Sequence, residues 1–155
     1  MPTFALNFSR PGSEVIAQYF MFTSLGREGY RRVMQNAQDV ATRISAGIAE
    51  MGPYRLLTRG DELPVFAFTL NDDVKNYSVF DVSAHMRQRG WLIPAYTFPQ
   101  NRQDLSVLRI VVRAGMSLDM ADLLLRDIRE ETAALEALDG PLPDRKGGPL
   151  KAFAH

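Results

Sequence analysis

The chain has 155 residues, 46% of them apolar, and its 18 basic and 18 acidic residues give a formal net charge of zero. The length predicts one ordinary domain with an apolar core, and the balanced charge argues against a nucleic-acid interface or a polybasic membrane patch. No apolar run reaches the roughly 18 residues of a membrane span, and the absence of cysteine excludes disulfides and is compatible with a reducing cytosol.

The first third of the chain predicts a short extended segment followed by a long helix. Residues 3–8 are extended, and Ser13 is a favourable N-cap for the helix that follows. Apolar residues then recur at spacings of three and four, which is typical of an amphipathic helix. The glycines Gly26 and Gly29 predict a break in this helix, and Gly52-Pro53 ends it.

The rest of the chain alternates between extended and helical patterns. Extended segments are expected at residues 54–58, 64–70, 91–98 and 106–113. Helices are expected at 78–89 and 117–138, each after a capping serine. The segment 64–70 is apolar at both alternating sets of positions, which predicts a central strand covered on both faces. The order of elements predicts an α+β fold, with helices mainly against one face of an antiparallel sheet of about four strands.

The composition also suggests how the chain is divided. Residues 1–12 are expected to form an N-terminal extended segment, residues 13–138 a small domain, and residues 139–155 a flexible tail rich in glycine and proline.

Arg109 is the most informative single residue of the sequence. In the segment Ser106 to Arg113, strand alternation places Arg109 on one face with two valines, and Leu108 and Ile110 on the other. A guanidinium on a covered strand needs an anionic partner, and its planar fork suits a carboxylate. The alternatives are that this face is open to water, or that Arg109 pairs with a structural Asp or Glu.

Few other residues offer chemistry. Ser9 and Arg10 could contact an anion beside a helix start, or they could simply form a corner of the chain. His85 is interpreted as a packed or surface residue of a short helix, and His155 as a solvated chain end. No metal-binding or nucleotide-binding motif is present.

Several stretches together resemble one enzyme family. These are "TFALNFSRPGSEVIAQYF", "AEMGPYRLL", "MRQRGWLIPAYTFP", "LRIVVRAGMSLDMADLLLRDI" and a closing Phe-x-His. In this order they are similar to the C-terminal part of the glutamate decarboxylases, which are group II pyridoxal-phosphate-dependent decarboxylases. The resemblance implies the small C-terminal domain of a fold-type I enzyme, a cytoplasmic homo-oligomer built on a dimer, and L-glutamate as the substrate.

The resemblance also implies roles for four residues. Arg109 matches the family arginine that binds the substrate α-carboxylate. Ser9, with Phe8 beside it, matches the serine that reaches the cofactor phosphate of the neighbouring subunit. His155 matches a histidine that closes the site in some bacterial members, as a group that titrates near neutral pH could do.

One feature that the family needs is absent from this sequence. None of the three lysines, Lys75, Lys146 and Lys151, lies in the Ser-x-His-Lys setting that holds pyridoxal 5'-phosphate. The chain is therefore expected to be a C-terminal fragment whose N-terminal and large domains are missing, and to be inactive alone. Two alternatives stay open: a stand-alone α+β binding or dimerisation module, and the same domain from a decarboxylase of another amino acid.

Overall fold

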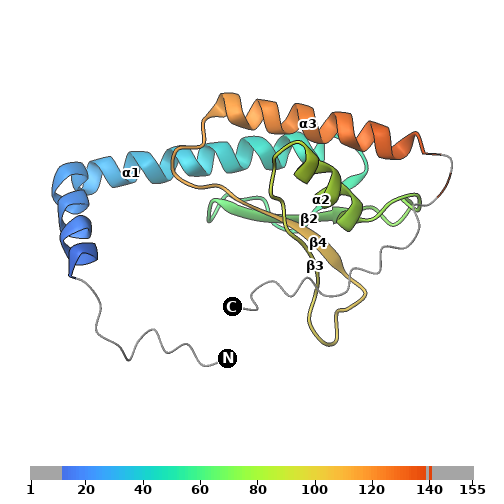
Figure 1. Cartoon of the computed structure of the whole chain (residues 1–155), viewed down its shortest axis with the longest axis horizontal. Coiled ribbons are helices and arrows are strands. Elements are labelled where there is room, and N and C mark those ends of the chain that lie inside the picture. The colour runs from blue at the N-terminus through green and yellow to red at the C-terminus, as the bar shows by residue number, and fades with distance from the viewer. Residues whose placement is uncertain (1–11, 139, 141–155) are drawn as a thin grey trace. The chain divides into compact units, whose positions relative to one another are not determined.

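The computed structural model of the chain describes residues 12–138 and 140 (Figure 1). Two compact units are present, Met1–Gln35 and Asn36–His155. The elements are α1 (Ser13–Ala49), β1 (Tyr54–Leu56), β2 (Val65–Leu70), α2 (Val79–Gln88), β3 (Ala95–Thr97), β4 (Ser106–Val111) and α3 (Leu118–Glu136). The three helices and four strands within residues 12–138 confirm the predicted α+β class. The predicted domain limits at residues 12 and 139 adjoin residues outside the described part and stay predictions.

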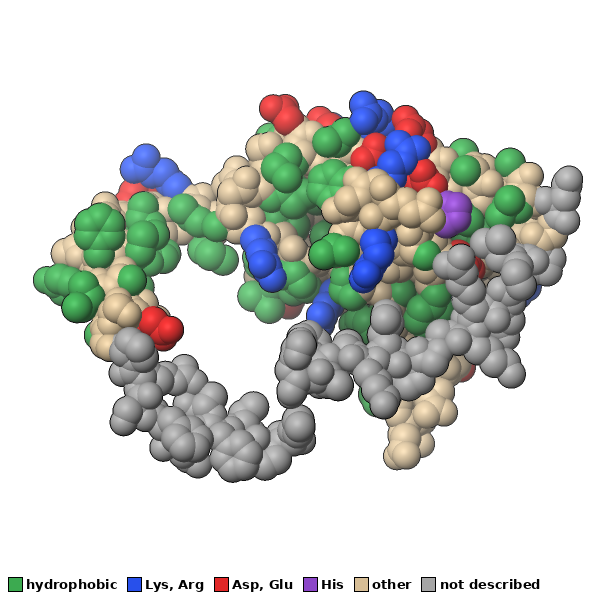
Figure 2. All heavy atoms as spheres, viewed as in Figure 1, with side chains coloured by type: hydrophobic (Ala, Val, Ile, Leu, Met, Phe, Trp, Pro, Cys, Tyr) green, Lys and Arg blue, Asp and Glu red, His purple; other side chains and the backbone are tan. Residues whose placement is uncertain are grey.

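The first unit contains the N-terminal part of α1, which is interrupted at Gly26. Gly26 has φ 57° and ψ −175°, a conformation that residues with a Cβ rarely adopt, so the predicted break is confirmed there, while Gly29 remains helical. Large apolar side chains of this unit are exposed to solvent, as the green surface over the start of α1 shows (Figure 2). They are Val15, Ile16, Tyr19, Phe20, Met21 and Phe22.

The second unit is a four-stranded antiparallel sheet in the order β1-β2-β4-β3, covered on one face by helices (Figure 1). This face is covered by α2, α3 and the residues of α1 from Asn36 onward. Alternate residues of β2 and β4 point into this core, where Phe66, Phe68 and Leu108 are almost fully buried. The prediction that the helices lie mainly against one face is confirmed.

Local sequence signals account for the ends of α2 and α3. Ser78 and Asp81 form a reciprocal capping box at the start of α2, and Ser117 accepts a hydrogen bond from the backbone N–H of Met120 at the start of α3. Gly90, which follows α2, has φ 89° and so turns the chain into the segment that leads to β3.

The second face of the sheet is more open than the sequence predicts. On this face Val65 and Ala67 of β2 are only half-buried, and Val111 of β4 is 53% exposed. The prediction that β2 is covered on both faces is therefore wrong for the described residues. An apolar strand is compatible with a half-open face because small side chains such as Ala67 expose little surface. None of the helices within residues 12–138 combines the length and the apolar character that a bilayer span needs.

Candidate functional site

Arg109 lies on the open face of the sheet, in the middle of β4. It is paired across the ladder with Ala67 of β2, and its backbone N–H donates to the carbonyl oxygen of Pro94 at 3.1 Å on the other side. These two neighbours fix the backbone of Arg109 between two strands. Its side chain leaves the sheet on the face opposite the helices, and it is exposed.

Arg109 lines a cleft of about 360 Å³. The other wall residues come from the loop between β1 and β2 and from the first residues of β2. We call this depression the Arg109 cleft. Its lining residues are Thr58, Arg59, Gly60, Asp61, Glu62, Leu63, Val65, Phe66, Ala67 and Arg109.

The loop between β1 and β2 is fixed by contacts with α1. The Ser45 hydroxyl donates to the carbonyl oxygen of Arg59 at 2.7 Å, and the Gln38 amide donates to the carbonyl oxygen of Asp61. Gly60 lies so close to α1 that a Cβ built on it would stand 3.2 Å from the Cβ of Ala41. The loop is thus packed on a helix of the core, and contacts with α1 fix the position of this part of the cleft.

A second set of hydrogen bonds fixes the loop to β2. The Thr58 side-chain oxygen accepts from the backbone N–H of Ala67 at 3.0 Å. The backbone N–H groups of Leu57 and Thr58 both point at the carbonyl oxygen of Ala67, at 2.8 and 3.3 Å. Two residues of one strand thus face one residue of the other, as in a β-bulge, and this turns the chain away from the ladder beside Arg109.

Among the described residues, the guanidinium of Arg109 has an aromatic neighbour and no acidic one. Its Cζ lies 5.6 Å from the centre of the Tyr96 ring, which is within the range of a cation–π contact. Among the described residues no carboxylate lies within ion-pairing distance of Arg109, although Asp61 and Glu62 line the same cleft. The N–H groups of the guanidinium are therefore available to an added anion.

This geometry suits binding better than acid-base catalysis. A guanidinium with a free fork can hold a carboxylate through two parallel hydrogen bonds. The hydroxyl of Thr58 already accepts a hydrogen bond from the backbone, and no histidine within residues 12–138 lines the cleft. No group of three or more potential metal ligands occurs within the described residues.

The surroundings of Arg109 agree only in part with those that the sequence predicts. The predicted strand faces are confirmed, because Leu108 and Ile110 are buried while Arg109 is not. Arg109 itself is exposed, as one of the alternatives held, so burial does not demand an anionic partner, although Val107 on the same face is buried. Arg59 also lines the cleft, and like Arg109 it has no carboxylate within ion-pairing distance among the described residues; what distinguishes Arg109 is its contact with the Tyr96 ring. Ser9, Phe8 and His155 lie outside the described residues.

The described residues do not fit pyridoxal 5'-phosphate as a covalently held cofactor. Such a cofactor needs a lysine amine in the site. Lys75 is the only lysine between residues 12 and 138; it is exposed, and it is absent from the lining of the Arg109 cleft.

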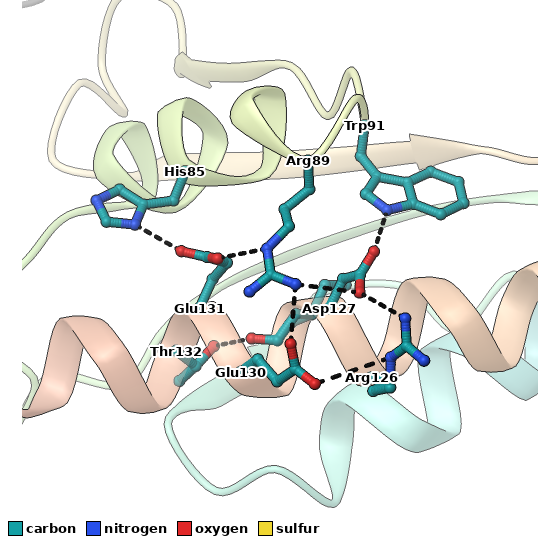
Figure 3. Close-up of polar contacts among 9 residues, drawn as sticks. His85, Arg89, Trp91, Arg126, Asp127, Glu130, Glu131 and Thr132 are labelled. Carbon is teal, nitrogen blue, oxygen red and sulfur yellow. Dashed lines mark hydrogen bonds and ion pairs between the residues drawn. The ribbon is translucent and has the colours of Figure 1, made fainter.

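A second polar cluster joins α2 to α3 (Figure 3). His85 Nδ1 lies 2.8 Å from one carboxylate oxygen of Glu131, and Arg89 Nε lies 2.7 Å from the other. Arg89 also pairs with Glu130 at 2.8 Å, and the Trp91 indole N–H donates to Asp127 at 2.7 Å. Every acid here already has a partner, so the cluster connects the two helices and leaves no group free for a ligand. His85 is thus a packed helix residue, as its interpretation from the sequence held.

Electrostatics support this structural role. The contact with His85 and the neighbouring Arg89 guanidinium hold the pKa of Glu131 below its ordinary value, although its partial burial acts in the opposite direction. Asp127 is buried, and the sequence pattern does not single it out. Its carboxylate accepts a hydrogen bond from Trp91 and lies near two arginines, Arg89 at 3.6 Å and Arg126 at 3.5 Å. These contacts satisfy the buried carboxylate.

The sequence reasoning also missed Tyr96 and the loop residues of the cleft. In the sequence, Tyr96 is one of three aromatic residues between positions 91 and 98, and no motif sets it apart. The position of Tyr96 could have been predicted from the extended segments 91–98 and 106–113. If these segments pair in antiparallel order, alternate residues of both lie on one face of the sheet. The packing of Gly60 on Ala41 had no comparable signal, because it depends on a contact between distant parts of the chain.

The chain is similar in sequence and in structure to known proteins. The chain is 44% identical over 131 residues to the glutamate decarboxylase of Aliivibrio fischeri, and 40% identical over 144 residues to that of Solanum lycopersicum. The chain is homologous to a part of the glutamate decarboxylases. Its structure agrees with that of the glutamate decarboxylase of Lactobacillus brevis at a TM-score of 0.81, with 31% identity. The fold expected from the resemblance, the small domain of a fold-type I enzyme, is confirmed. No family model matches the chain.

The coverage of these matches is unequal. The alignments include 83% and 93% of this chain but only 28% of each of the two glutamate decarboxylases. The structural match likewise includes 84% of this chain and 30% of the Lactobacillus protein. The chain thus spans less than a third of the length of the relatives that it matches.

Proposed function

We propose that this chain is the C-terminal domain of a glutamate decarboxylase and supplies the arginine that binds the substrate carboxylate. The complete enzyme would convert L-glutamate and a proton to 4-aminobutyrate and carbon dioxide. The observation that carries this proposal is the position of Arg109 on the wall of a cleft, without a carboxylate partner among the described residues, in a chain homologous to glutamate decarboxylases.

Arg109 would act by holding the α-carboxylate of the substrate. Two parallel hydrogen bonds from the guanidinium would fix the plane of this carboxylate and so the direction of the bond that breaks. The backbone of Arg109 is held between Ala67 and Pro94, so the position of the guanidinium depends mainly on its side-chain rotamer. A rigid strand is a suitable support for a group that must be placed accurately.

The proposal also includes roles for the cofactor, for a neighbouring subunit and for His155. Pyridoxal 5'-phosphate would be held mostly by residues that this chain lacks, because none of its three lysines lies in a Ser-x-His-Lys setting. Ser9 and Phe8 would contact the cofactor phosphate of a neighbouring subunit in a homo-oligomer built on a dimer. His155 would close the site. These roles rest on the resemblance to the family, and the enzyme would be cytoplasmic with no nucleic-acid or membrane partner.

A chimera tests the proposed function. The segment of the Aliivibrio fischeri enzyme that matches this chain would be replaced by the matching residues of this chain, and release of carbon dioxide from L-glutamate would be measured with added pyridoxal 5'-phosphate. We expect activity from the chimera and none from the 155-residue chain alone. A folded chimera that releases no carbon dioxide would favour a stand-alone binding module. Activity with another amino acid in place of L-glutamate would favour a decarboxylase of different substrate.

A further inference from the structure

The open face of the sheet carries a row of three side chains that ends at the cleft. The rings of Tyr96 and Phe98 lie nearly parallel, 11° apart, with their centres separated by 6.4 Å. The Arg109 guanidinium lies on the Tyr96 ring, with its Cζ 5.6 Å from the ring centre. The order is therefore Phe98, Tyr96, Arg109 and then the cleft.

The register of β3 and β4 produces this row. Tyr96 is paired with Val107 across the ladder, so Arg109 is its diagonal neighbour on the same face. Diagonal neighbours on an antiparallel pair are within reach of each other when one is aromatic and the other long. Phe98 follows Tyr96 by two residues and therefore lies on the same side.

Hydrogen bonds hold the two strands in this register beyond the ends of the short β3 strand. The N–H of Phe98 donates to the carbonyl oxygen of Leu105 at 2.8 Å, which extends the hairpin past Thr97. The Thr97 and Ser106 hydroxyl oxygens are 3.1 Å apart, within hydrogen-bonding distance. Tyr96 is thus held at a fixed position along β4, next to Arg109.

A contact with the face of a ring does not use the N–H groups of a guanidinium. The five N–H donors of Arg109 therefore stay available for a carboxylate. The contact with the ring also reduces the number of conformations that the long Arg109 side chain explores. Less conformational entropy is then lost when a ligand binds. An arginine held in this way is pre-organised for an anion.

We propose that Tyr96 is a positioning residue, which together with Phe98 holds the Arg109 guanidinium toward the cleft with its N–H fork free for the substrate carboxylate. This inference rests on the proposed function for the identity of the carboxylate. The ordering of Arg109 by Tyr96 does not depend on it. The two parts can therefore be tested separately.

The first test uses the full 155-residue chain and measures the side-chain order of Arg109. Nitrogen-15 relaxation of Arg109 Nε and contacts between Arg109 and ring protons would be compared in the wild type, Tyr96→Phe and Tyr96→Leu. We expect Tyr96→Phe to keep an ordered Arg109, because the ring remains, and Tyr96→Leu to make it mobile. Tyr19→Leu, which removes an exposed tyrosine of the first unit, is the matched control and should leave the Arg109 signal unchanged.

The second test measures steady-state kinetics in the active chimera. An exposed cation–π contact corresponds to a change of about two- to fivefold in an equilibrium constant. Tyr96→Leu should therefore raise KM for L-glutamate by this factor with a smaller change in kcat, and Tyr96→Phe should restore the wild-type KM. A purely structural role for Tyr96 would lower stability without changing KM.

The outcomes separate the two claims. An ordered Arg109 in Tyr96→Leu, or an unchanged KM in a chimera whose activity depends on Arg109, would overturn the positioning role and leave the proposed function in place. An inactive chimera, with Arg109 still ordered by Tyr96 in the free chain, would refute the proposed function. The positioning of the guanidinium by Tyr96 would then remain supported.

Discussion

Nδ1 of His85 in α2 and a carboxylate oxygen of Glu131 in α3 are 2.8 Å apart, within hydrogen-bonding distance. The Glu131 side chain is 15% exposed, and its second oxygen accepts from Arg89 at 2.7 Å. Helices α2 and α3 are thus connected by one carboxylate that contacts both His85 and the Arg89 guanidinium. This connection has consequences for stability that can be measured without knowledge of the function.

Replacing Glu131 with Gln should destabilise the fold at neutral pH. The pKa of Glu131 is lower in the folded chain than in the unfolded one, so its contribution is fully present above the unfolded value and is lost as pH falls through the folded value. We expect Glu131→Gln to reduce the free energy of unfolding by about 1.5–3 kcal/mol at pH 7, as for a hydrogen bond to a charged group. Urea unfolding at pH 7 and at lower pH would measure the difference.

Glu130→Gln is the matched control for this prediction. Glu130 is on the same helix and also contacts Arg89, but its side chain is 49% exposed, so the loss should be smaller, below about 1 kcal/mol. The difference between wild type and Glu131→Gln should shrink as the solution is acidified below the ordinary glutamate pKa of about 4.3. A difference that stays constant down to pH 3 would show that the stabilisation does not come from the ionised carboxylate.

Replacing Gly60 with Ala should destabilise the wall of the cleft. Gly60 has φ 77°, and a left-handed conformation costs a residue with a Cβ about 1–2 kcal/mol. The added methyl would also press on Ala41 of α1, at 3.2 Å. Thermal unfolding of Gly60→Ala should show a loss of at least this size.

Gly52 offers a control that separates the two effects. It also has a positive φ, 93°, but a Cβ at this position would meet no atom within 4 Å. Gly52→Ala should therefore show only the conformational penalty and be less harmful than Gly60→Ala. Equal losses in the two variants would mean that the contact between the loop and Ala41 contributes nothing.

The exposed apolar side chains at the start of α1 should make the isolated chain self-associate. Val15, Ile16, Tyr19 and Phe20 are each at least 65% exposed, and clustered apolar surface of this kind favours association. Sedimentation over a range of protein concentrations should show oligomers that dissociate on dilution. Phe20→Asp should shift the equilibrium toward the monomer, whereas Glu14→Asp should have no effect. A wild-type chain that stays monomeric at every concentration would contradict this prediction.

The sequence was most informative where structure depends on neighbouring residues. The capping box of Ser78 and Asp81, the break at Gly26 and the two faces of β4 all follow from local geometry, and the structure confirms each of them. These features depend on a hydrogen bond, a dihedral angle or an alternation within a few residues, so their signals lie in short stretches of sequence.

The candidate site was only partly predictable because it depends on distant contacts. Arg109 could be singled out from its alternation with valines, but its exposure depends on what covers the sheet, which no local pattern records. The contact between Tyr96 and Arg109 needs the register of two strands, and the cleft needs the packing of Gly60 on Ala41. The α2–α3 cluster was likewise missed, because His85 and Glu131 are 46 residues apart in the sequence.

The central claim is that the Arg109 guanidinium binds the substrate carboxylate, and the kinetics of Arg109 variants in the chimera test it most directly. Loss of one partner from a hydrogen-bonded charge pair costs about 2–5 kcal/mol, so Arg109→Met should lower kcat/KM for L-glutamate by roughly 30-fold or more. Arg109→Lys should recover only part of this loss, because lysine keeps the charge without the fork. Arg102→Met, at an exposed arginine of the β3–β4 hairpin, should change kcat/KM by less than about twofold. A folded, active chimera in which Arg109→Met retains the wild-type kcat/KM would contradict the account.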